Sequence, residues 1–179
     1  MGIFENLKKL FSIEKENPQT TTAPEVPQTT PEIPKPQTHR VTGVKYYEKN
    51  LLQISKEENP NFQLTKKDLI KNDLIDQAIY QYTFHPQNVE LIPEPTNEHD
   101  PNAVKVVVDG QHVGYIKAGS CKRILNLISG ERIAKIECAI SGGSYKAVYA
   151  EGMEGNRVVE YSFEKGKEDF KVTLSIYER

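Results

Sequence analysis

The stretch EPTNEHDPNAVKVVVDGQHVGYI, residues 94–116, joins a polar loop to an apolar hairpin. Asn, Asp and Pro fill its first half, and these residues shape turns by bonding their own backbone or by stiffening it. The apolar run 104–108 predicts a strand, Asp109-Gly110 is a strong hairpin signal, and residues 113–116 predict the returning strand. A stiff loop loses little entropy on binding, so this stretch suits recognition as well as architecture.

Short strands dominate the prediction on both sides of this stretch. The remaining strands are expected at 41–47, 89–92, 132–141, 145–150, 158–163 and 170–177, with Gly142-Gly143 as a break. Helices are expected at about 66–82, behind a capping-box pattern at Thr65 and Asp68, and at about 119–129, ahead of Gly130. The sequence therefore predicts a mainly β fold with two or three helices, arranged as a small, curved sheet or barrel.

Three segments are predicted along the chain. Residues 1–13 place apolar side chains at helical spacing and predict a short amphipathic helix. Residues 14–38 are rich in Pro and Thr and predict a disordered, extended linker. We expect a folded domain at 39–179, with a helical insertion at about 48–83.

Several classes of function lack support in the sequence. The formal net charge of −2 gives no positive field over the whole chain, so nucleic-acid binding must rest on a local patch. No Gly-rich phosphate loop, HExxH or GxSxG motif occurs, and the four His and two Cys lack metal-ligand spacing. We therefore expect no enzyme activity, no cofactor and no metal. The absence of a long apolar run and of a signal peptide predicts a cytoplasmic protein.

The quoted stretch, preceded by VTGVKYY at 41–47, resembles the HIRAN domain family. The resemblance rests on a Gly-containing first strand that ends in aromatics, the loop with Asn97, Asp100, Asn102 and Ala103, and the Val-Gly-Tyr of the hairpin. It covers about 41–47 and 85–130 well and extends weakly to about 150. It implies a small OB-like β-barrel that binds nucleic acid.

The resemblance also implies roles for individual residues. Lys45 would meet the DNA backbone, and Tyr46, with Tyr47 beside it, would stack on the terminal base. Asn97 and Asp100 would contact the end nucleotide, with the carboxylate accepting from its 3′-hydroxyl. The remaining candidates are Tyr115, Lys117 and Tyr145. Lys45 and Tyr115 depart from the Arg and His of the family pattern, and Lys lacks the planar fork of Arg.

We therefore expect a non-catalytic module that binds single-stranded DNA or a 3′-hydroxyl DNA end, in DNA repair, replication or mobile-element biology. Aromatic stacking and lysine contacts would bind any base, which is typical of a protein that recognises an end and not a sequence. The alternative is a protein–protein interaction module, in which residues 1–13 form a tethered helical ligand for a partner. Peripheral membrane contact by that segment is not expected, because two lysines anchor weakly.

Overall fold

The structure is a computed structural model that describes residues 35–155 and 157–179. The predicted helix at 1–13 and all but the last residues of the predicted linker lie outside the described residues. No helix in the described part of the chain is long and apolar enough to cross a membrane.

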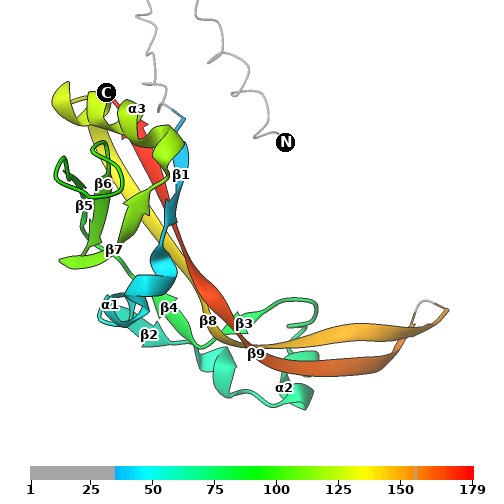
Figure 1. Ribbon diagram of the computed structural model, residues 1–179. Coiled ribbons are helices and arrows are strands. Elements are labelled where there is room, and N and C mark those ends of the chain that lie inside the picture. Colours follow the sequence, from blue (N-terminus) through cyan, green and yellow to red (C-terminus); the bar gives the residue numbers. More distant parts are fainter. Residues whose placement is uncertain (1–34, 156) are drawn as a thin grey trace, which may run out of the picture. The chain divides into compact units, whose positions relative to one another are not determined.

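Seven antiparallel strands form the main sheet, in the order β3-β8-β9-β1-β7-β6-β5 (Figure 1). This confirms the predicted mainly β class. The sheet is not closed in the described part, because β3 and β5 each pair on one side only. The strands are β1 (Gln37–Thr42), β3 (Ile79–Tyr80), β5 (Val89–Pro93), β6 (Val104–Val108), β7 (Gln111–Ile116), β8 (Ile133–Glu154) and β9 (Arg157–Glu178).

Alternating residues of β6 and β9 build the main core. Val104, Val106 and Val108 on β6 are fully buried, and so are Val172, Leu174 and Ile176 on β9. The period of two along a strand sends these side chains to one face, where burial of apolar area stabilises the fold. Helix α3 (Ala118–Ser129) adds Cys121, Ile124 and Leu127 to the same cluster. The predicted helix at 119–129 and the hairpin at Asp109-Gly110 are both confirmed.

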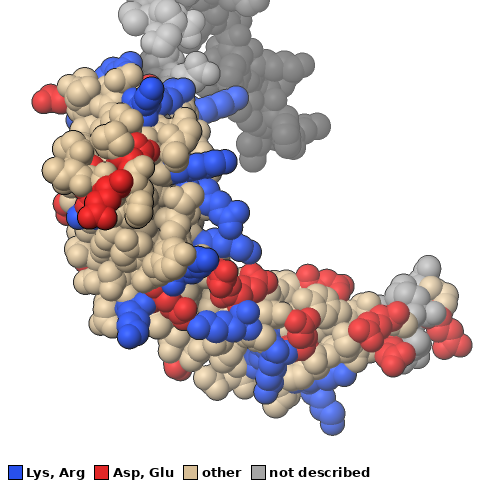
Figure 2. All heavy atoms as spheres, viewed as in Figure 1, with Lys and Arg blue, Asp and Glu red and all other residues tan. Residues whose placement is uncertain are grey.

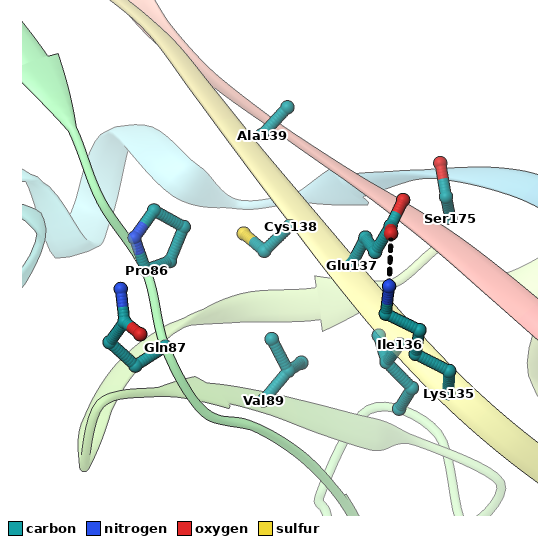
Figure 3. A pocket seen from close by; sticks show the side chains of 9 residues that line it. All are labelled: Pro86, Gln87, Val89, Lys135, Ile136, Glu137, Cys138, Ala139 and Ser175. Carbon is teal, nitrogen blue, oxygen red and sulfur yellow. Dashed lines mark hydrogen bonds and ion pairs between the residues drawn. The ribbon is translucent and has the colours of Figure 1, made fainter.

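A cleft remains where the sheet fails to close, between β5 and the first half of β8 (Figure 3). Its cavity measures about 440 Å³, with Pro86, Gln87 and Val89 on one side and residues 135–139 of β8 on the other. The Lys135 Nζ lies 2.6 Å from Glu137 Oε1 at this cleft. The structure is therefore an open version of the predicted barrel.

The last two strands are far longer than predicted. The expected strands at 132–141 and 145–150 form the single strand β8, and those at 158–163 and 170–177 form β9. Gly142-Gly143 shifts the register of the pair and does not break it. A Cβ at Gly142 would lie 2.5 Å from the Asp169 carbonyl oxygen, so glycine lets the two strands stay in contact there. The β8–β9 pair continues past this point as a two-stranded arm.

The insertion after β1 contains less helix than predicted. Strand β1 ends at Thr42, and Val44–Tyr47 forms the 3-10 helix η1 instead of the expected strand. Short elements follow: α1 (Glu48–Leu51), β2 (Lys56–Glu58), η2 (Pro60–Gln63), α2 (Lys66–Lys71) and β4 (Tyr82–Phe84), which pairs with β2.

The prediction of a helix over 66–82 is wrong beyond residue 71, although its capping box is confirmed. Helix α2 ends at Lys71, and Asp73 and Asp76 prevent its continuation because both have φ of 57°, outside the range of a right-handed helix. The apolar side chains that follow in sequence belong to a loop and to β3. Leu69 and Ile79 of the insertion bury Val148 of the arm between them.

Candidate nucleic-acid interface

Helix η1 presents an aromatic ring and a lysine to solvent. Val44 is buried and anchors η1 to the core, while Tyr46 keeps 77% of its surface exposed. The Lys45 Nζ lies 5.0 Å from the centroid of the Tyr46 ring, within range of a cation–π interaction. An exposed ring beside a cation is suited to a nucleotide, because a base can stack on the ring and the cation attracts the anionic phosphate.

Behind η1 lies a cluster of three rings. The Tyr47 centroid is 4.0 Å from that of His112 and 6.4 Å from that of Tyr115. The His112 and Tyr115 rings are 4.9 Å apart. Regular alternation would send residues three apart to opposite faces of β7. Val106 pairs with Gly114 and Val107 with His112, so Val113 is an extra residue, and this bulge brings both rings to one face.

The cluster is tied to the 94–103 loop through Glu94. The Tyr115 hydroxyl donates to Glu94 Oε2 at 2.9 Å, and Asn97 Nδ2 donates to the same oxygen at 2.7 Å. Lys105 Nζ lies 3.7 Å from Oε1. The hydrogen bonds from Asn97 and then Tyr115 lower the pKa of Glu94, whereas burial, followed by the bonds with Glu94 and Tyr47, raises the pKa of Tyr115. Glu94 is therefore an anion and Tyr115 a neutral donor at pH 7.

The loop itself is held by side chains that bond its own backbone. Asn97 Oδ1 accepts from the amides of His99 and Asp100, at 3.0 and 3.2 Å. Asp100 Oδ1 accepts from the amide of Asn102 at 2.8 Å. The hydrogen bonds of the described residues leave the second oxygen, Asp100 Oδ2, without a donor. The loop is thus stiff, and the half-buried Asp100 carboxylate keeps one oxygen without a hydrogen-bond donor among the described residues.

These contacts bring most of the predicted residues to one region. Tyr47 touches Tyr115, and Tyr115 connects through Glu94 to Asn97, which bonds the backbone of Asp100. Lys45 and Tyr46 share η1 with Tyr47.

The two other predicted residues lie apart from this contact network. Lys117 is exposed at the N-cap of α3, directly after β7. Tyr145 is on β8 beyond the glycine pair, where its hydroxyl donates to Glu164 and its ring lies 6.2 Å from that of Tyr80. No contact described for it reaches η1 or the 94–103 loop.

Sequence reasoning missed three members of the network: Glu94, Lys105 and His112. A signal for Glu94 existed, since it opens the same stiff loop. Lys105 pairs with Tyr115 across the hairpin only because of the extra residue in β7. Gly114, beside the extra residue, was the sequence signal for this bulge, because glycine inside a strand often marks one.

The charge distribution is uneven although the net charge is −2. Figure 2 shows Lys and Arg side chains gathered along one flank, beside β1 in the view of Figure 1. A local basic surface of this kind attracts phosphates even when the whole chain is slightly acidic. Among the described residues, no group of His, Cys, Asp and Glu is arranged to hold a metal ion.

Comparison with known proteins gives a family and one solved structure. The sequence model described as the HIRAN domain matches residues 38–144, which is well over half of the chain. The structure titled "Crystal structure of HIRAN domain of human HLTF" is similar at 14% sequence identity and a TM-score of 0.38. That match covers 81% of this chain and 77% of the other. No curated protein matches the sequence.

Proposed function

Because the chain belongs to the HIRAN domain family of nucleic-acid-binding domains, we propose that it is a module that binds single-stranded DNA at a 3′-hydroxyl end. In this proposal the module does no chemistry itself and serves DNA repair, replication or mobile-element biology.

The observation that supports this proposal most strongly is the exposed Tyr46 ring with Lys45 above it. Large aromatic side chains are usually at least partly buried, whereas the Tyr46 ring is exposed to solvent on a helix that Val44 anchors to the core. Stacking on such a ring contributes roughly 1–3 kcal/mol per base and does not depend on the base. The ring therefore suits any terminal nucleotide.

The loop supplies the preference for an end. Asp100 Oδ2 can accept a hydrogen bond from a hydroxyl, but it repels the phosphodiester of a continuing strand, which is anionic and has no proton to donate at neutral pH. In a strand that continues, the 3′ carbon of this sugar carries a phosphate in the position where a free end has a hydroxyl. The Asn97 and Asn102 bonds hold the carboxylate in place before DNA arrives, so little entropy is lost on binding.

Titration of fluorescent single-stranded oligonucleotides at two salt concentrations tests the role of η1. Tyr46→Ala should weaken binding roughly 5- to 100-fold, because the stacking surface is removed. Tyr46→Phe keeps the ring and should bind nearly as the wild type does. Lys45→Gln should make the salt dependence shallower by about 0.7 in log–log slope, the value for one phosphate contact on a single strand.

Equal binding by Tyr46→Ala and the wild type would show that η1 is not the stacking surface. Failure of the wild-type protein to bind any oligonucleotide would favour a protein-interaction module instead.

A further inference from the structure

A second hollow lies where the insertion meets the β8–β9 arm. Its cavity measures about 490 Å³, and its lining includes three lysines and two phenylalanines. No carboxylate is among the described residues that line it. The lining residues are Phe62, Gln63, Leu64, Thr65, Lys66, Lys146, Phe163 and Lys165.

Strand register places the arm's contribution on one face. Lys146 pairs with Lys165, and Val148 pairs with Phe163, so these four side chains share a face of the two-stranded arm. The insertion covers Val148 on that face and leaves the hollow at its edge. Tyr145 alternates to the opposite face.

Lys146 is a buried cation that forms no ion pair with a carboxylate in the part of the chain that the structure describes. Only 6% of its surface is exposed, its Nζ donates to the Leu64 carbonyl oxygen, and it lies 5.3 Å from the Phe62 ring centroid. Burial, and then repulsion from Lys165, lowers the pKa of Lys146. A buried ammonium with only a carbonyl as its hydrogen-bond partner gains strongly from an anion beside it.

The carboxylates of Asp68 and Glu164 accept hydrogen bonds from other groups, although Asp68 still attracts Lys146 electrostatically. Asp68 Oδ2 accepts from the amide and hydroxyl of Thr65 at 3.0 and 2.6 Å. Glu164 accepts from the Tyr145 hydroxyl on the other face of the arm. Lys66 donates to the Tyr161 carbonyl oxygen at 2.6 Å. Among the described residues, no carboxylate forms an ion pair with Lys66, Lys146 or Lys165, so their positive charge is offset only by the longer-range attraction of Asp68.

Phe163 repeats the arrangement of Tyr46. It is 37% exposed, and the Lys165 Nζ lies 5.5 Å from its ring centroid. The exposed large hydrophobic residues among those described are Tyr46, Ile92 and Phe163, and the two aromatic ones each carry a lysine over the ring.

The two ring–lysine pairs are linked along β9. Lys167 Nζ lies 2.5 Å from Glu48 Oε1, and Glu48 follows η1 directly. Lys165 is two residues from Lys167, about 7 Å along a strand, on the same face. A further cavity, lined in part by Glu48, Ser144 and Lys167, lies between them. The Lys167–Glu48 contact therefore connects the region of η1 to the face of β9 that carries Lys165.

We propose that this hollow binds a second nucleotide of the same single strand, with the phosphate between Lys146 and Lys165 and the base against Phe163. The inference rests on the proposed function, because it takes the strand to be the one held at η1. The site uses the insertion and the distal part of the arm, and Lys146, Phe163 and Lys165 lie outside the residues that the family model matches.

Full-length protein is titrated by fluorescence anisotropy with oligothymidylates of about 4 and about 16 nucleotides, each ending in a 3′-hydroxyl or a 3′-phosphate. Phe163→Ala and Lys165→Gln should each weaken binding of the longer strand about fivefold or more, with no change for the shorter strand. Lys165→Gln should also reduce the salt slope by about 0.7. Lys71→Gln is the matched control, because this exposed lysine of the insertion does not line the hollow.

Wild-type affinity and salt slope in both variants with the longer strand would overturn the second site, even where end selectivity holds. Loss of affinity in Phe163→Ala without any preference for a 3′-hydroxyl in the wild type would support the second site and contradict the end recognition. Thermal melting of each variant shows that the fold is retained, and neither substitution removes a buried side chain.

Discussion

At the scale of single residues, Gly114 decides whether β1 can join the sheet beside the ring cluster. Its φ is 143°, and a Cβ there would lie 2.4 Å from the Thr42 carbonyl oxygen. Gly114→Ala should therefore cost more than the 1–3 kcal/mol of backbone strain alone, measured by urea unfolding. Gly110→Ala is the control, because Gly110 also has positive φ (76°) but has open space around its Cβ position. Equal losses in the two variants would contradict a steric role for Gly114.

The ionised Glu94 carboxylate should stabilise the folded protein at neutral pH and lose this effect in acid. Hydrogen bonds from Asn97 and Tyr115 lower its folded-state pKa below the ordinary value of 4.5. A depressed carboxyl pKa contributes stability above the unfolded-state value, and this contribution disappears as the pH falls through the folded-state value. The melting temperature of the wild type should exceed that of Glu94→Gln at pH 7, and the difference should shrink towards pH 3. A difference that stays constant over this range would show that the charge of Glu94 contributes nothing.

The sequence predicted single residues correctly where the conformation depends only on the residue and its chain neighbours. Asp109-Gly110 forms the predicted turn because both residues take positive φ, 49° and 76°. Tyr115 was predicted as a site residue, but its hydrogen-bond partner Glu94 was not, and neither was His112. Their meeting depends on the extra residue in β7, which Gly114 hints at, but the resulting register is a property of the two paired strands.

At the scale of elements, the cap of α2 should contribute measurably to the insertion. Thr65 Oγ1 accepts from the Asp68 amide at 3.3 Å, and Asp68 Oδ2 accepts from the Thr65 amide at 3.0 Å. Thr65→Ala should lower the free energy of unfolding by about 1 kcal/mol, and Thr65→Ser should restore most of it. Equal stability of Thr65→Ala and the wild type in chemical denaturation would mean that the cap is not formed.

The errors at this scale have physical causes. The apolar rhythm of 69–82 matches a helix, but Leu69 and Ile79 reach the same cluster from a short helix and a strand, with a loop between them. The glycine pair at 142–143 was expected to end a strand, whereas it lets β8 and β9 shift register and continue. Local periodicity therefore predicts which side chains are buried. It predicts less reliably whether a helix, a loop or a strand carries them.

At the scale of the whole molecule, a chain with a net charge of −2 still places a lysine over each of its two exposed aromatic rings in the described part. Tyr46 with Lys45 and Phe163 with Lys165 lie on two regions joined by the Lys167–Glu48 contact. The family model matches residues 38–144, which include the first region and the insertion, whereas Lys146, Phe163 and Lys165 of the arm lie beyond that match. We propose that the first region recognises the 3′ end of the strand and that the second region binds a further nucleotide of the same strand.

The most direct test of this account compares oligonucleotides that differ only in a terminal 3′-hydroxyl or 3′-phosphate. Wild-type protein should bind the hydroxyl form several-fold more tightly, because Asp100 Oδ2 accepts from a hydroxyl and repels a phosphate. Asp100→Asn should abolish the difference, mainly by improving affinity for the phosphate form, while the Asn97 and Asn102 contacts preserve the loop. Equal affinity of the wild type for both ends, with measurable binding to each, would contradict the claim that this module recognises a 3′-hydroxyl.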